Sequence, residues 1–164
     1  MKVWSVRIAI FLSVFLAVGC GPYSFSASGK LAFKSINVVS FENQTIEYEL
    51  TDRLYDAVIE TFIQDNTVQV LDATSAEAVM TGNLTSYRRD PYNYDAQDAV
   101  SQYAVKVTFH VKVVKAASED VIWEEDFYAE GIYDANSESE TEEGQQRVID
   151  KITADILDKT TKSW

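Results

Sequence analysis

The chain has 164 residues, with 14 Lys and Arg against 26 Asp and Glu, a single His and a single Cys. This length suits one domain, and 46% apolar residues can build a hydrophobic core. One His and one Cys cannot form a zinc site or an intramolecular disulfide. A formal net charge of -12 argues against a nucleic-acid-binding protein, which needs a basic surface.

The first twenty residues have the pattern of a bacterial lipoprotein signal. Lys2 and Arg7 precede an apolar run at residues 8–18, which is shorter than the roughly 20 residues of a membrane-spanning helix and fits a secretory signal. The run ends at Gly19-Cys20, which resembles a lipobox, whose Cys is lipid-modified and becomes the first residue of the mature chain. The alternative is an ordinary signal peptide with an incidental Cys, but lipid attachment at Cys20 explains why a secreted protein carries one unpaired Cys.

Cleavage before Cys20 would remove two basic residues and leave 12 basic against 26 acidic side chains, a net charge of -14. Gly21, rather than Asp, would then be the second residue, which by resemblance to the sorting signals of enteric bacteria points to the outer membrane. We therefore expect a lipoprotein signal peptide at residues 1–19, a lipidated tether at 20–34 and a single domain at 35–164. Several acyl chains at Cys20 would give stable membrane anchoring.

The first half of the domain has the pattern of a βαβ unit. Ser35–Phe41 is apolar and β-branched, as in a buried strand, and Thr67–Asp72 is a second strand candidate. Between them, Glu47–Asp65 shows helical periodicity and ends at Asp65-Asn66. Strand, helix and strand in this order predict parallel pairing. The helix residues expected to face inward are Leu50, Leu54, Tyr55, Val58, Ile59, Phe62 and Ile63.

The second half predicts three antiparallel strands and a final helix. Apolar and polar residues alternate over Ala78–Arg89, Gln102–Lys115 and Val121–Tyr133, and Asp90–Val100 reads as an aromatic and acidic loop. Ser139 and Glu142 form a capping-box pattern that opens the helix. The apolar strand faces carry Ala78, Met80, Gly82, Leu84, Tyr103, Val105, Val107, Phe109, Val111, Val113, Val121, Trp123 and Phe127; Val148, Ile149, Ile152, Ile156 and Leu157 face inward from the helix.

These elements predict an α+β fold. Amphipathic helices and strands with one apolar face each bury their apolar surfaces in two layers. We expect a two-layer sandwich in which two helices pack on one face of a mixed four- to five-stranded sheet. The clean alternation in the last three strands indicates that the other sheet face is partly open to solvent.

The sequence offers no catalytic constellation and no cofactor motif. It has no glycine-rich phosphate loop and no Gly-x-Ser-x-Gly elbow, and acidic pairs are too abundant to be informative. The only imidazole, His110, falls on the polar face of a strand beside Lys106 and Lys112. A hairpin that places Lys115 opposite Val121 puts Lys112, His110 and Lys106 opposite Glu124, Asp126 and Glu130. We therefore expect cross-strand ion pairs rather than an anion site, and we expect a protein that is not an enzyme.

Positive charge and aromatic side chains gather at one other place. The first of the three antiparallel strands is expected to end and enter its loop at Tyr87, Arg88 and Arg89. Two further aromatic residues, Tyr92 and Tyr94, follow just beyond. Guanidinium groups beside aromatic rings suit ligand or partner contact through stacking and bidentate bonds. In the alternative interpretation, the two Arg only balance the nearby carboxylates Asp90, Asp95 and Asp98.

Several segments together resemble the LptE family of lipopolysaccharide-assembly lipoproteins. They are residues 19–25 (GCGPYSF), 36–45 (INVVSFENQT), 84–95 (LTSYRRDPYNYD), 121–125 (VIWEE) and the closing Trp164. The resemblance covers nearly the whole mature chain and rests on the order and spacing of the segments. It implies two helices on a mixed sheet and a non-enzymatic role at the outer membrane.

The resemblance also implies partners. It suggests that the domain binds and plugs the outer-membrane β-barrel LptD and helps to deliver lipopolysaccharide, with basic residues near a strand end, here Arg88 and Arg89, in contact with it. A different role fits the same strand–helix–strand pattern: a periplasm-facing lipoprotein module that activates a peptidoglycan synthase or belongs to a secretion pore. Recovery of a large barrel protein with the chain would separate the two.

The lipid attachment at Cys20 is testable by itself. We expect Cys20→Ser to leave an unprocessed or soluble form, because the thioether acceptor is lost. Mass spectrometry of the mature protein checks this, and an unmodified Cys20 on the wild-type chain would refute it.

Overall fold

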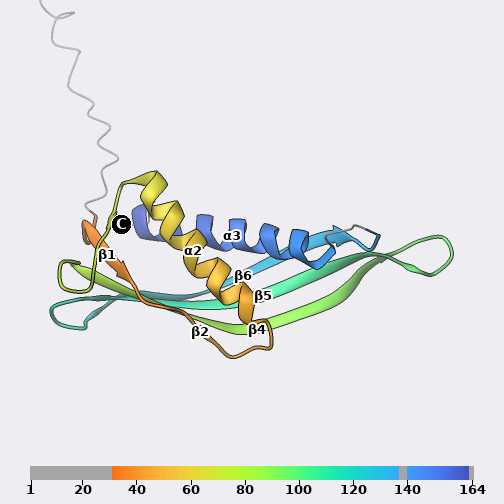
Figure 1. Ribbon diagram of the computed structural model, residues 1–164, viewed down its shortest axis with the longest axis horizontal. Coiled ribbons are helices and arrows are strands. Elements are labelled where there is room, and N and C mark those ends of the chain that lie inside the picture. The colour runs from red at the N-terminus through yellow and green to blue at the C-terminus, as the bar shows by residue number, and fades with distance from the viewer. Residues whose placement is uncertain (1–30, 137–139, 163–164) are drawn as a thin grey trace, which may run out of the picture.

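The structure, a computed structural model, describes residues 31–136 and 140–162 (Figure 1). The signal peptide, Cys20, most of the tether, Ser139 of the expected capping box and Trp164 lie outside these residues. The elements in chain order are β1 (Ser35–Val38), β2 (Glu42–Asn43), α2 (Tyr48–Asp65), β3 (Gln69–Val70), β4 (Ala78–Tyr94), β5 (Val100–Lys115), β6 (Val121–Asp134) and α3 (Glu140–Lys162).

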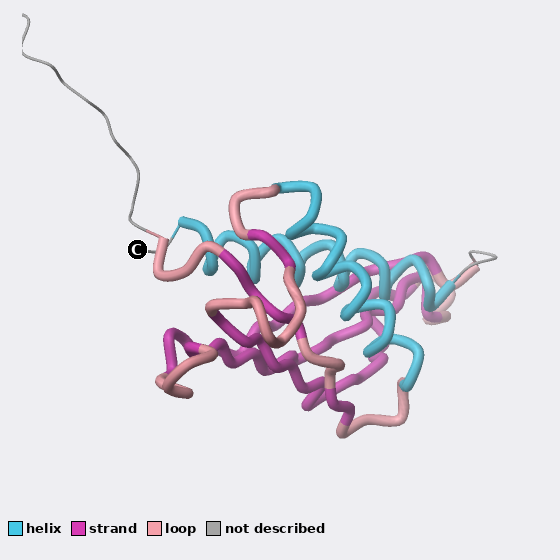
Figure 2. Tube along the Cα trace, turned by 60° about the vertical axis from the view of Figure 1, so that its left-hand side comes forward, coloured by secondary structure: helices cyan, strands magenta, loops and turns pink. Residues whose placement is uncertain are grey.

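The strands form one mixed sheet with both helices on the same face. The strand order is β3-β1-β4-β5-β6, and β2 pairs with β4 beside β1. β1 is parallel to β3 and β4, whereas β4, β5 and β6 form an antiparallel meander. Figure 2 shows α2 and α3 side by side above the sheet, with the opposite sheet face uncovered by helices. The predicted α+β two-layer architecture is confirmed.

The first helix follows its sequence pattern closely. Leu50, Leu54, Val58 and Phe62 are buried at i, i+4 spacing, which gives α2 its core stripe. Tyr55, Ile59 and Ile63 were also expected to face inward, and they lie beside this stripe. Tyr55 and Ile59 are partly buried against the core, but Ile63 is 62% exposed, so its predicted burial is wrong. The helix ends where expected, because Asn66 adopts a left-handed conformation and its amide bonds to the Phe62 carbonyl at 3.0 Å.

The predicted βαβ unit is present but its strands are shorter than expected. β1 ends at Val38 rather than Phe41, and β3 keeps only Gln69 and Val70 of the expected Thr67–Asp72. The two strands pair in parallel, as predicted. β1 also pairs in parallel with β4 on its other side, which places the short unit at one end of the sheet.

The meander register was also predictable from the sequence. Lys112, His110 and Lys106 lie opposite Glu124, Asp126 and Glu130, as expected. The register shifts next to the turn, where Val121 lies opposite Val114 instead of Lys115. This irregularity turns Val121 away from the apolar face, so its side chain is 51% exposed and its predicted burial is wrong.

The expected loop at Asp90–Val100 is mostly strand. β4 continues to Tyr94, and only residues 95–99 connect it to β5. Beyond Leu84, β4 pairs with β5 alone, so Pro91 lies in an edge strand, where its missing N–H costs no ladder bond. We call residues 87–106 the β4–β5 arm; Figure 1 shows it extending past the N-terminal end of α3.

Two glycines fix the height of α3 above the sheet. A Cβ atom on Gly131 of β6 would lie 1.9 Å from the Gly144 carbonyl oxygen of α3, and a Cβ on Gly144 would lie 2.6 Å from the Tyr133 ring. Neither glycine has a positive φ, so the requirement is space rather than backbone conformation. The helix and the strand therefore touch backbone to backbone at this point, with Tyr133 packed beside it.

The core makes a quantitative prediction for α2. Phe62 is 1% exposed and belongs to the same cluster as Val107 and Phe109 of β5. Phe62→Ala should lower the free energy of unfolding by about 3–5 kcal/mol, because it leaves a cavity. Chemical denaturation measures this, and Ile63→Ala on the exposed side of the same helix should change it by only about 0.5 kcal/mol. A loss below about 1 kcal/mol for Phe62→Ala would contradict the packing.

Candidate partner-binding surface

The structure separates the five residues singled out in the sequence. They do not form one strand-end tip: Tyr87, Arg88 and Arg89 lie within β4, five or more residues before its end. Tyr87 and Arg89 stand opposite the buried Val107 and Val105, on the side of the helices, whereas Arg88 stands opposite Lys106 on the helix-free face. A register shift between Leu84 and Ser86 sets this alternation.

Tyr87 ties the arm to both helices. Its hydroxyl accepts a hydrogen bond from Gln145 Nε2 of α3 at 3.3 Å, and Gln145 Oε1 accepts one from Arg53 Nη1 of α2 at 2.9 Å. Arg53 Nη2 also donates to Gln146 Oε1 at 2.9 Å. Burial raises the pKa of the Tyr87 hydroxyl above its ordinary value near 10.0, so the group remains a neutral hydroxyl in this network.

Arg89 braces the base of the arm. Its guanidinium carbon lies 4.0 Å from the centroid of the Tyr103 ring and 5.7 Å from that of Tyr133, and its Nε donates to the Tyr133 hydroxyl. The two tyrosine rings stack with centroids 5.9 Å apart. Since Tyr103 lies on β5 and Tyr133 on β6, one side chain connects three strands.

Arg88 faces solvent on the other side of the sheet. Its side chain is 66% exposed, and its guanidinium lies 3.8 Å from Asp90, which also receives the Lys106 ammonium at 3.2 Å. Asp95 has a different role, because it accepts hydrogen bonds from the amides of Gln97 and Ala99 in the turn. Of the three carboxylates named in the charge-balance interpretation, Asp90 contacts Arg88, and Asp95 caps the turn instead.

Tyr92 and Tyr94 are exposed near the end of the arm. They are 53% and 56% exposed, and neither ring packs against another aromatic ring within residues 31–136 and 140–162. Together with Arg88, they give the arm exposed apolar area and a cation on an acidic chain. Exposed aromatic and guanidinium groups on a projecting hairpin suit contact with a partner molecule.

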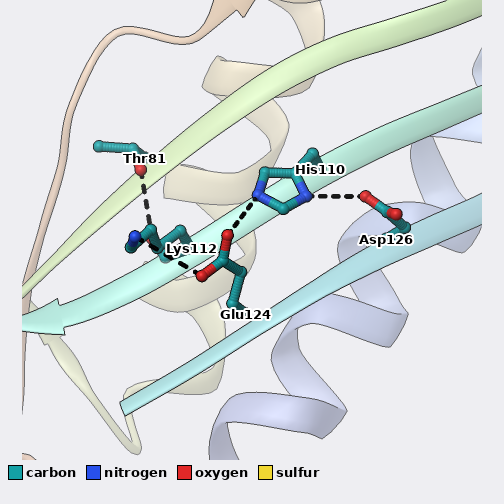
Figure 3. A network of polar contacts seen from close by, with 5 residues as sticks. All are labelled: Thr81, His110, Lys112, Glu124 and Asp126. Atoms are coloured by element: carbon teal, nitrogen blue, oxygen red, sulfur yellow. Dashed lines mark hydrogen bonds and ion pairs between the residues drawn. The ribbon is translucent and has the colours of Figure 1, made fainter. Parts of the chain in front are cut away.

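Two residues of the basic stripe on the helix-free face, His110 and Lys112, pair with carboxylates of β6, as Figure 3 shows. His110 Nδ1 lies 2.7 Å from Asp126 and Nε2 lies 3.0 Å from Glu124, which is also 3.5 Å from Lys112 Nζ. Each ring nitrogen of His110 therefore has a carboxylate of β6 within hydrogen-bond distance. Lys106 differs from the expectation, because its ammonium contacts Asp90 rather than Glu130.

Residues 31–136 and 140–162 contain no helix long and apolar enough to cross a bilayer. Within the same ranges, no group of three or more His, Cys, Asp or Glu side chains is placed to hold a metal ion. The features that remain are a two-layer α+β domain and an arm with exposed aromatics. The arm is the candidate surface for contact with other molecules.

The chain belongs to the LptE lipopolysaccharide-assembly family, whose model matches residues 33–160. The match confirms the resemblance noted in the sequence, indicates a role in lipopolysaccharide assembly and identifies the chain as a non-enzymatic assembly lipoprotein. No curated protein sequence matches the chain.

Solved structures of low sequence identity share the fold. A minor lipoprotein from Acinetobacter baumannii is 18% identical, with a TM-score of 0.53 over 80% of this chain and 94% of that one. Lipoprotein B from Nitrosomonas europaea is 10% identical, with a TM-score of 0.56 over 80% and 84%. The PelC dodecamer from Paraburkholderia phytofirmans is 17% identical, with a TM-score of 0.53 over 80% and 90%.

Sequence reasoning missed the side chains that hold the arm. Arg53 and Gln145 are 92 positions apart, and no local pattern brings them together. Tyr103 and Tyr133 were within reach, because the register that pairs Lys106 with Glu130 also pairs these two tyrosines. Extending that register along β5 and β6 would have indicated the platform beneath Arg89.

The two arginines should respond differently to truncation. Arg89→Ala should lower the free energy of unfolding by about 1–2 kcal/mol, because it removes a cation–π contact and a hydrogen bond. Arg88→Ala, the matched control, should change it by only about 0.5 kcal/mol, since exposed ion pairs contribute little. Urea unfolding of both variants measures the difference, and equal losses would show that Arg89 does not brace the arm.

Proposed function

We propose that the chain is an outer-membrane lipoprotein, anchored through Cys20, that binds the LptD barrel and assists lipopolysaccharide assembly through its β4–β5 arm. The proposal includes the domain division made from the sequence: signal peptide at residues 1–19, tether at 20–34 and folded domain at 35–164. Membership of the LptE family supports this role over that of a periplasm-facing activator or secretion-pore module.

The arm is the observation that carries the proposal. It projects past the helices as strand pairs rather than as a loop, so it presents side chains from a defined backbone (Figure 1). Tyr87 and Arg89 hold its base through contacts to α3, β5 and β6. Arg88, Tyr92 and Tyr94 are then the side chains available to a partner. A pre-ordered arm loses less conformational entropy on binding than a mobile loop would.

The exposed side chains fit the chemistry of both expected partners. Tyr92 and Tyr94 offer apolar area with a polar hydroxyl, which suits a protein interface. Arg88 offers a guanidinium that can bind the carboxylates of a barrel lumen or the phosphates of lipopolysaccharide. We assign Arg88, Tyr92 and Tyr94 to partner contact, and Tyr87 and Arg89 to holding the base of the arm.

A triple variant tests this division. Arg88→Ala/Tyr92→Ala/Tyr94→Ala should keep the melting temperature, because these side chains are exposed, and should reduce co-purification of LptD about tenfold or more. The outer membrane should become permeable to large antibiotics, and lipopolysaccharide recovered with the complex should fall.

The control removes equally exposed apolar side chains elsewhere. Ile46 and Tyr48, at 82% and 73% exposed, lie at the start of α2, and Ile46→Ala/Tyr48→Ala should leave barrel binding unchanged. Wild-type recovery of LptD with the triple variant would refute contact through the arm. Absence of any LptD with the wild-type chain would refute the barrel as the partner.

A further inference from the structure

The last strand of the sheet has one edge that no described strand occupies. β6 pairs with β5 only, in residues 31–136 and 140–162, so its other side presents backbone N–H and C=O groups to solvent. The pairing with β5 runs without a register shift from Trp123 to Asp134. A regular edge of this length is a template for another extended chain, because each backbone group on it lacks a hydrogen-bond partner within the sheet.

The free edge of β4 beyond Leu84 is blunted in ways that the β6 edge is not. Beyond Leu84, the outer side of β4 is interrupted by register shifts and contains Pro91, which has no N–H to donate. Such devices prevent unwanted strand pairing. β6 contains no Pro, and its single irregularity lies at its start beside Val121.

A cavity follows the β6 edge on the side of the helices. Its volume is about 410 Å³, and it is lined by residues 125–128 of β6 and by Asp155, Asp158 and Lys159 of α3. No β5 residue lines it, so it opens on the side of β6 that faces away from β5. Side chains of an added strand that point toward the helices would enter this space beside Glu125 and Phe127. Tyr128, which is 56% exposed, alternates to the helix-free face of β6.

The charges along the β6 edge indicate which kind of polypeptide segment would bind there. Four acidic side chains lie on the helix-free face of β6, namely Glu124, Asp126, Glu130 and Asp134, and Tyr128 and Ile132 hold the two remaining positions between them on that face. The first two are engaged by His110 and Lys112. Asp134 accepts a hydrogen bond from Gln102 Nε2 at 2.9 Å and Glu130 accepts one from the Tyr128 hydroxyl at 3.5 Å, but neither carboxylate has an ion pair in the described part of the chain. A strand with Lys or Arg at alternate positions would meet these carboxylates as cross-strand pairs.

The same charges disfavour a second copy of this chain. Antiparallel pairing of two β6 strands about Tyr128 would place Glu130 opposite Asp126, and like charges in that position are destabilising. The cavity is also mainly acidic, although Lys159 pairs with Glu125 at 2.7 Å, and Lys151 and Lys162 pair with Asp155 and Asp158.

We propose that the β6 edge is a second binding surface, separate from the arm, which adds an extended polypeptide segment with Lys or Arg at alternate positions as a further strand of the sheet. The proposal concerns a different edge of the sheet and does not depend on which protein the arm contacts. The segment would gain its affinity from backbone hydrogen bonds and its specificity from Glu130 and Asp134.

Synthetic ten-residue peptides and the full-length chain in detergent test the proposal. One peptide alternates Lys with Thr and Val, a second has Glu in place of Lys, and a third has the first composition with a central Pro. The first should bind and slow hydrogen exchange of β6 amides, whereas the Glu and Pro peptides should bind at least about tenfold more weakly.

Two double variants with the same change in net charge, one on β6 and one on α2, test whether the β6 carboxylates are responsible for binding. Glu130→Lys/Asp134→Lys should weaken binding of the Lys peptide about tenfold or more. Asp52→Lys/Asp56→Lys on the exposed side of α2 should leave it within about twofold. If the first variant does not fold, Glu130→Gln/Asp134→Asn should give a smaller loss in the same direction.

Several outcomes would overturn the inference. They are no binding of the Lys peptide, equal binding of the Pro peptide, equal losses in the two double variants, or exchange protection outside β6. Dimers of the wild-type chain that dissociate in Glu130→Lys/Asp134→Lys, seen by analytical ultracentrifugation, would identify a second copy as the occupant and also overturn it.

Discussion

The backbone contact between Gly131 and Gly144 is the constraint on which the rest of the structure depends. It lets α3 lie closer to β6 than any side chain on either residue would permit. At that distance, Gln145 can reach Tyr87 of β4, and Tyr133 is packed where Arg89 can bond to its hydroxyl. The position of the arm relative to the helices is therefore set at the contact of α3 with the sheet.

The sheet uses its two faces in different ways. The side covered by helices holds the apolar residues of β4, β5 and β6, and the opposite side carries paired charges such as Lys112 with Glu124. Cross-strand pairs of this kind contribute little each, but they leave few unpaired cations on that face. Arg88 lies on the same face within the arm, where its side chain is 66% exposed and contacts Asp90 at 3.8 Å.

Much of the fold was predictable, because the spacing of apolar residues and the order of charged residues in the sequence both match the structure. The i, i+4 row from Leu50 to Phe62 predicted the buried side of α2. A short hairpin after Lys115 predicted the register that pairs His110 with Asp126 in β5 and β6. The errors occur where local pattern and tertiary context compete. Pro91 and the polar residues after it indicated a loop, but an edge strand tolerates both, so β4 continues to Tyr94.

The candidate site was less predictable for the same reason. The cluster of Tyr87, Arg88 and Arg89 was visible, but strand alternation and one register shift decide which residue faces the helices. The long-range contacts of Arg53 with Gln145 depend on how the two helices pack, and a single sequence carries no periodic signal for them.

The length of β4 sets the distance between the start of the sheet and the end of the arm. Its first residue, Ala78, pairs with Ile36, so it lies beside the point where the described chain enters the sheet, and its last residue lies at the end of the arm. Seventeen residues at a rise of about 3.3 Å each make a strand of up to about 55 Å, longer than the roughly 30 Å hydrocarbon thickness of a bilayer. Under the proposed anchoring at Cys20, the end of the arm would lie up to about 55 Å from the point where the described chain enters the sheet, and the length of one strand sets that span.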